Sequence, residues 1–98
     1  MTVETMTPKQ RFLAALNGKV LDRPCAASIT SVVNFELMDI VGSHFPEANT
    51  DPEPMAELAA SAHDVMGFDS VMPIFGIAQE ATALGCVVDF SDPGNLPT

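Results

Sequence analysis

The chain has 98 residues, with 13 Asp or Glu against 4 Lys or Arg, and a net charge of −9. Hydrophobic residues make up 47% and charged residues 17%, which excludes a disordered chain, since disorder requires low hydrophobicity and dense charge. The length admits one small domain at most. Four scattered cations cannot neutralise a phosphate track, so we expect no nucleic-acid partner. No apolar run approaches the roughly 18 residues of a membrane span, so we expect no membrane segment.

The first predicted element is a helix over residues 7–18. Thr7 is a suitable N-cap, Pro8 suits the first helical position, and Gly18 is a natural terminator. Three apolar residues at helical spacing predict the buried stripe of this helix: Phe12, Leu13 and Leu16. The polar stretch 19–24 ends in proline and is predicted to be a loop.

Three further helices are predicted, over residues 34–41, 51–67 and 77–84, each closed by a glycine at or just beyond its end. Residues 43–50, between the first two, are expected to be irregular. The helix at 51–67 has the clearest pattern, because six apolar residues follow the spacing of one buried face: Met55, Leu58, Ala59, Ala62, Val65 and Met66.

Three short apolar runs, at residues 25–30, 70–75 and 86–90, are predicted to be strands. Strands that alternate with helices imply parallel pairing through right-handed crossovers, so the fold class is α/β. Three parallel strands with their helices cannot close a barrel or form a fully covered sheet. Residues 1–98 are therefore expected to form one incomplete domain, whose open sheet edge could support self-association.

Ligands of parallel α/β proteins bind in the loops that follow the strands. The loop after the first predicted strand is rich in hydroxyl and amide groups, and the loop after the second offers an amide and a carboxylate. The candidate ligand-binding residues are Ser28, Thr30, Ser31, Asn34, Gln79 and Glu80. Hydroxyls and amides also cap helices, and a carboxylate also favours a helix start, so a purely structural role remains open for each.

The two cysteines, Cys25 and Cys86, lie 61 positions apart and belong to no metal-binding pair. We interpret them as reduced thiols packed as small hydrophobic residues, which favours a cytoplasmic location. The N-terminus has neither the basic start nor the apolar run of a signal peptide. No metal site is predicted in this segment.

Several stretches together resemble the start of the uroporphyrinogen decarboxylase superfamily, and most closely its methylcobalamin:coenzyme M methyltransferase branch. The opening TPKQRFLAALNG (7–18) and DRP (22–24) are similar to the family's entry helix and its approach to the first strand. ELMDIVG (36–42) and FPEA (45–48) resemble a stretch of the methyltransferase branch. GFDSV (67–71) and ALGC (83–86) are similar to the family's second strand and the end of the next helix.

The resemblance implies the N-terminal third of a (β/α)8 TIM barrel, which needs roughly 250 residues in full. For the intact enzyme it implies a methyltransferase that moves a methyl group from a methylated corrinoid protein to a small thiol such as coenzyme M. Zinc and a corrinoid (cobalamin) would be its cofactors. The zinc ligands of the branch would lie beyond Thr98, so no cofactor is expected to be bound by this segment alone.

Two alternatives stand beside this one. The first is uroporphyrinogen decarboxylase itself, a lyase of porphyrin biosynthesis. Its members resemble one another in an arginine after the first strand and an aspartate after the second, whereas the loop 30–34 here has no arginine and the aspartate position falls on Gly76. The second is a short, non-catalytic α/β module that self-associates.

Overall fold

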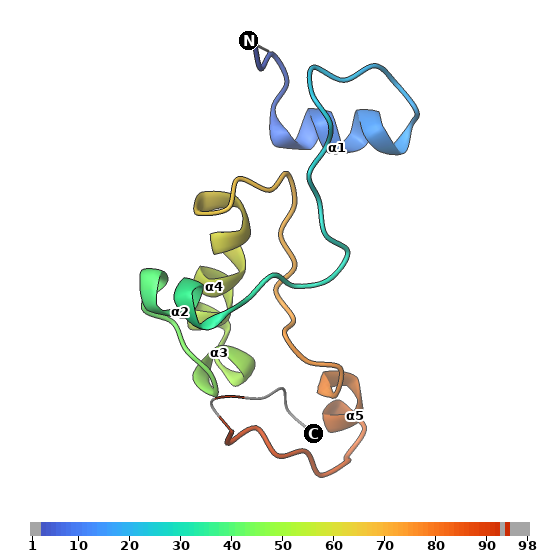
Figure 1. Ribbon diagram of the computed structural model, residues 1–98. Helices are drawn as coiled ribbons and strands as arrows, with labels where there is room; N and C mark the ends of the chain where they lie inside the picture. Colours follow the sequence, from blue (N-terminus) through green and yellow to red (C-terminus); the bar gives the residue numbers. More distant parts are fainter. Residues whose placement is uncertain (1–2, 93, 95–98) are drawn as a thin grey trace.

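The computed structural model describes residues 3–92 and 94. Five helices lie within these residues, and their bounds are α1 Pro8–Leu16, α2 Phe35–Val41, α3 Glu47–Thr50, α4 Pro52–Asp64 and α5 Gln79–Ala83. Figure 1 shows α1 apart from the group formed by α2, α3 and α4, with α5 on the far side of the molecule. Two long stretches without regular secondary structure connect these parts. The predicted helices are confirmed, and α1, α4 and α5 are shorter than predicted.

Helix α1 begins as its sequence predicts. The Thr7 hydroxyl accepts a hydrogen bond from the Gln10 backbone N–H (3.1 Å), and the Gln10 side chain accepts one from the Thr7 N–H (2.9 Å). The predicted apolar stripe is wrong for the described structure, because Leu13 and Leu16 are 46% and 69% exposed. The buried residues of α1 are Arg11 and Ala14, since this helix faces two carboxylates rather than an apolar core.

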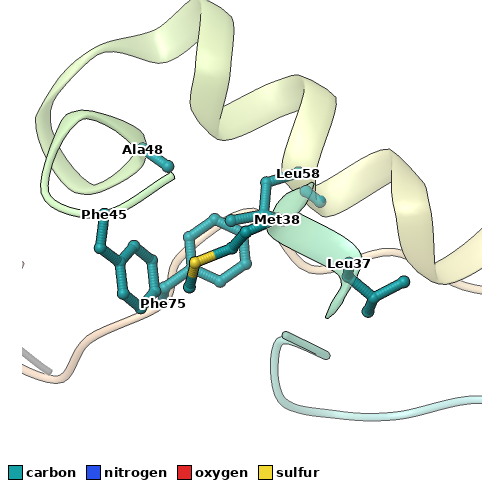
Figure 2. Packing of buried hydrophobic residues seen from close by; sticks show 7 residues of the cluster. Leu37, Met38, Phe45, Ala48, Leu58 and Phe75 are labelled. Carbon is teal, nitrogen blue, oxygen red and sulfur yellow. The ribbon is translucent and has the colours of Figure 1, made fainter. Parts of the chain in front are cut away.

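The apolar core lies where α2, α3 and α4 meet. Its buried members come from these helices, from the turn before α3 and from the segment before α5: Leu37, Met38, Phe45, Ala48, Leu58, Ala59 and Phe75. In Figure 2 the Phe75 ring lies beside the Phe45 ring and the Met38 side chain. The Phe45 and Phe75 rings are 5.7 Å apart between centroids and their planes are tilted by 59°, and this separation lies within the range that is favourable for aromatic pairs. Phe75 thereby fixes the 71–78 segment to the helices.

Helix α4 buries most of the face that its sequence predicts. Leu58, Ala59 and Ala62 are almost fully buried, whereas Val65 and Met66 follow the helix and are about half exposed. The segment 43–50, expected to be irregular, contains the short helix α3. Helix α3 is a single turn that packs against α4. It has too few residues to show the hydrophobic periodicity by which a helix is predicted from sequence.

The predicted strands at 25–30, 70–75 and 86–90 are not formed in the described structure, and these stretches have no regular secondary structure. The first two nevertheless run side by side in the same direction. The Asp69 N–H donates to the Ala26 carbonyl (2.7 Å), and the Ser28 N–H donates to the Ser70 hydroxyl (3.2 Å). The Ser70 hydroxyl in turn donates to the Ser28 carbonyl (3.4 Å), so a side chain takes the place of the next rung of the ladder.

Candidate functional site

A buried ion-pair cluster lies at the start of these two parallel stretches. The Arg11 side chain is 1% exposed and forms a bidentate contact with Asp22, through Nε to Oδ1 (2.8 Å) and Nη2 to Oδ2 (3.0 Å). Its Nη1 donates to Oδ1 of Asp69 at 2.6 Å. Arg23 donates to both oxygens of Asp69, at 3.0 and 3.1 Å, and through Nε to Glu4 at 2.7 Å.

The cluster is well satisfied by hydrogen bonds. Asp22 also accepts the backbone N–H groups of Thr5 and Met6, and Asp69 accepts that of Ala26. The hydrogen bond from Arg11 is the main cause that holds the pKa of Asp22 far below its ordinary value. Burial by itself would raise the pKa of Asp69, but the Ala26 N–H and the two guanidinium groups outweigh it and lower that pKa. We interpret this cluster as structural, because every charged group in it has an opposite partner.

A hollow of about 490 Å³ lies at the other end of the same two stretches. We call it the central hollow, and its walls come from the segments 29–33 and 72–77: Ile29, Thr30, Ser31, Val33, Met72, Ile74, Phe75, Gly76 and Ile77. The volume lies within the range of small-molecule sites. Most lining side chains are apolar, and Thr30 and Ser31 supply hydroxyl groups. The buried Phe75 ring (Figure 2) connects this wall to the apolar core.

A second, smaller hollow of about 70 Å³ adjoins it. This side hollow is lined by Ile74, Gly76, Ile77, Gln79 and Glu80, three of which also line the central hollow. The Gln79 side chain has an unusual environment, because its Nε2 and its Oε1 are both buried and neither has a hydrogen-bond partner. Buried amides are normally paired, so a group that supplies both a donor and an acceptor is expected to stabilise it.

The structure therefore brings four of the six candidate residues to two adjoining hollows: Thr30, Ser31, Gln79 and Glu80. The other two have local structural partners. Asn34 is the N-cap of α2, and its Oδ1 accepts the Leu37 N–H (2.8 Å). Ser28 contacts the Thr30 hydroxyl (3.2 Å) and Ser70.

Sequence reasoning missed the apolar lining of the central hollow, above all Ile29, Met72 and Ile74. The signal was present in the apolar runs 25–30 and 70–75, which we assigned to strands. Ile29 is 92% exposed and Ile74 is 48% exposed, so these side chains form an open apolar wall. The sequence reasoning also assigned no partner to Asp69 or Arg11.

Among the residues that the structure describes, no group of three or more His, Cys, Asp and Glu side chains could hold a metal ion. Cys25 and Cys86 are free thiols, and burial is the main cause that raises the pKa of Cys25. No helix within residues 3–92 is long and apolar enough to cross a membrane.

The sequence matches the family Uroporphyrinogen decarboxylase (URO-D) over residues 7–98. The chain belongs to the uroporphyrinogen decarboxylase family. It is similar to the methylcobamide:CoM methyltransferase MtbA of Methanosarcina acetivorans, at 38% identity over 92 residues, which cover 94% of this chain and 27% of that protein. It is equally similar to the methylated-thiol–coenzyme M methyltransferase of Methanosarcina mazei, at 38% identity over 95 residues (97% of this chain and 26% of that protein).

A solved methyltransferase from Methanosarcina mazei shares the fold, with a TM-score of 0.86 and 36% identity. The match covers 95% of this chain and 28% of that structure. The chain thus spans about a quarter of the length of the curated relatives it matches. The resemblance noted from the sequence, to this family and to its methyltransferase branch, is confirmed.

Proposed function

We propose that this chain is the N-terminal part of a corrinoid-dependent methyltransferase, in which a methyl group passes from a methylated corrinoid to a small thiol such as coenzyme M. The observation that carries the proposal is the 38% identity, over nearly the whole chain, to enzymes named for methylcobamide, coenzyme M and methylated thiols. When bound, the corrinoid would supply a methyl group as an electrophile that a thiolate can attack. The proposal includes a cytoplasmic location, in keeping with the two free thiols.

The exposed surface supports the view that residues 1–98 form one incomplete domain. The accessible surface is 6520 Å², against about 5,400 Å² expected for a compact chain of this mass. The radius of gyration is 15.8 Å, against about 13 Å for a compact domain of this length. The difference of about 1,100 Å² is of the size that one partner buries in a specific interface.

We propose that the further β/α units of a (β/α)8 barrel cover this surface, and that the parallel stretches at 26–28 and 69–70 become regular strands there. Parallel sheets occur almost only where further elements cover both of their faces, and the barrel would supply those elements. Self-association through the same open edge is the alternative. Sedimentation of the 98-residue chain separates the two, because a discrete dimer would favour the self-associating module.

In this proposal the two adjoining hollows form part of the ligand pocket. They lie beyond the parallel stretches, at the end where α/β barrels bind their ligands, whereas the ion-pair cluster lies at the opposite end. Thr30, Ser31, Gln79 and Glu80 would line the pocket, with Ser28 and Asn34 supporting the loop. Zinc finds no ligand set among the described residues, so we assign it no role in this segment.

A chimera tests the proposal. Residues 7–98 of this chain replace the matching quarter of Methanosarcina acetivorans MtbA, and turnover is measured with methylcobalamin and coenzyme M as substrates. We expect measurable methyl transfer from the chimera, and none from MtbA that lacks the segment. A folded chimera without methyl transfer would contradict the proposal, and consumption of uroporphyrinogen would favour the decarboxylase alternative.

A further inference from the structure

We infer that a hollow beside the last turn of α4 is the docking surface for the outer helix of the next β/α unit, and that a basic side chain in the last turn of that helix pairs with Asp64. The inference rests on the proposed function, because the docking helix belongs to the further units of the barrel. It identifies where on the exposed surface one of these units docks and which charge recognises it.

The hollow, which we call the outer hollow, has a volume of about 260 Å³. Its walls come from the first residue of α1, from the end of α4 and from the start of the second parallel stretch: Pro8, Ala60, His63, Asp64, Asp69, Ser70 and Val71. None of these residues lines the central hollow or the side hollow. The outer hollow is therefore separate from the proposed ligand pocket.

Val71 places this hollow on the helix-covered side of the second parallel stretch. It lines the hollow together with Ala60 of α4, and it lies four positions before Phe75, a spacing that puts two side chains on one face of an extended chain. Phe75 is 3% exposed in the apolar core, whereas Val71 is 49% exposed. The helices that cover Phe75 therefore leave Val71 partly uncovered.

The geometry of a barrel identifies the element that would cover Val71. Helix α4 connects the two parallel stretches, and right-handed crossovers put the helix of the next unit beside it in the outer ring. Outer helices run antiparallel to their strands, so the last turn of the next helix lies at the same end as the last turn of α4. An apolar side chain of that helix would pack into the hollow between Ala60 and Val71.

The charges in the outer hollow select a basic partner. Asp64 is exposed and has no hydrogen-bond or ion-pair partner among the described residues, and no Lys or Arg lines the hollow. The Asp69 charge is already neutralised within the ion-pair cluster. The His63 Nδ1 donates to the Phe68 carbonyl (2.7 Å), which leaves Nε2 as an acceptor in the neutral ring. The hollow thus offers a negative charge and hydrogen-bond acceptors to whatever docks there.

The position of Asp64 is unfavourable for α4 itself. It is the last residue of this helix, where the helix dipole favours a positive charge. A residue that breaks a local rule in this way points to a role outside its own helix. A Lys or Arg in the last turn of the docking helix would neutralise Asp64, and the dipole of the docking helix would favour it as well.

The test measures one substitution in two proteins. The first is the 98-residue chain, and the second is the chimera with Methanosarcina acetivorans MtbA, which supplies the docking helix. Asp64→Lys removes the unfavourable carboxylate from the end of α4, so we expect the melting temperature of the 98-residue chain to stay the same or rise. In the chimera the introduced charge would meet a like charge, and the melting temperature should fall by about 3 °C or more.

A second variant tests the apolar part of the contact. Ala60→Leu fills the hollow from the α4 side, so it should leave the 98-residue chain as stable as before and lower the melting temperature of the chimera. Asp39→Lys is the matched control, because Asp39 is an exposed carboxylate of α2 outside the hollow. We expect it to shift the melting temperature equally in both proteins.

Equal shifts in the chain and in the chimera for both Asp64→Lys and Ala60→Leu would overturn the inference, because the outer hollow would then face solvent in both proteins. A loss in the chimera with Ala60→Leu alone would overturn the pairing of Asp64 with a basic side chain. Melting is measured whether or not the chimera transfers methyl groups, so a failure of the proposed function is recognised separately.

Discussion

The Arg11 Nη1 atom lies 2.6 Å from the Asp69 Oδ1 atom, although 58 positions separate the two residues in the chain. This contact ties α1 to the stretch that leads into the central hollow. Both side chains are 1% exposed, so the pair is shielded from solvent and from salt. The position of α1 therefore depends on charge pairing more than on apolar contact.

Asp69→Asn should destabilise the chain strongly. The substitution removes the negative charge that faces two guanidinium groups, and breaking a buried ion pair from one side leaves an uncompensated charge. We expect the free energy of unfolding to fall by about 3 kcal/mol, measured by urea denaturation. The matched control is Asp39→Asn, at an exposed contact with His44, which should change it by less than about 0.5 kcal/mol. Equal effects of the two substitutions would contradict the structural role of the cluster.

Acid should destabilise the chain through the same cluster. The pKa values of Asp22 and Asp69 are lowered in the folded state, so the unfolded chain takes up protons first as the pH falls. Their contribution to stability is therefore complete well above the ordinary Asp pKa of 3.8 and is lost as the pH falls from there towards the folded values. Urea denaturation at pH 7, 4 and 3 should show this loss. Asp69→Asn should make the dependence on pH shallower, and an unchanged slope would refute the assignment.

The two thiols should differ in reactivity. Burial raises the pKa of Cys25, and the nearby Asp69 charge adds to this, so its thiolate fraction at pH 8 is lowered. Cys86 is exposed. We expect a thiol-reactive dye to label Cys86 at least tenfold faster than Cys25. The Cys86→Ser variant should then show only the slow phase of labelling, and the Cys25→Ser variant only the fast phase. In urea the two thiols should be labelled at equal rates. Equal labelling rates in the folded chain as well would contradict the prediction.

Phe75→Ala should be far more costly than Phe35→Ala. Phe75 is 3% exposed and packs on Phe45, whereas Phe35, at the start of α2, is 63% exposed. Removal of a buried phenyl ring costs about 3–5 kcal/mol, so the first variant should lower the free energy of unfolding by that order and the second by less than about 1 kcal/mol. Thermal unfolding followed by circular dichroism provides the comparison. Similar melting temperatures for the two variants would mean that the 71–78 segment is not fixed to the core.

Most of the helices could be predicted because their signals are local. Thr7, Asn34 and Asp51 each cap a helix through a side-chain bond to a backbone N–H group two or three residues further on, and Thr7 was predicted to do so. The strands could not be predicted reliably, because a ladder depends on neighbours in space. Asp69 and Ala26 share one backbone bond, and the Ser70 hydroxyl takes the next rung.

The candidate site was predicted in part for the same reason. Thr30, Ser31, Gln79 and Glu80 could be found because loops after apolar runs are where α/β proteins place ligands. Whether a side chain caps a helix or lines a hollow depends on the backbone conformation around it, which is why Asn34 was left open between the two roles. The unpartnered state of the Gln79 amide has no sequence signal, since it is a property of the packing alone.

The ion-pair cluster also implies an order of events during synthesis. Arg11 and Asp22 are 11 positions apart, and closing so short a loop costs less entropy than closing the 58-position loop to Asp69. The local pair can therefore form while the rest of the chain is still being made, and Asp69 joins it after α4 has emerged. A ribosome that pauses before residue 69 would hold a nascent chain in which the Arg11 Nη1 still lacks the Asp69 carboxylate, and which a folding assistant or a protease could still distinguish from the finished form.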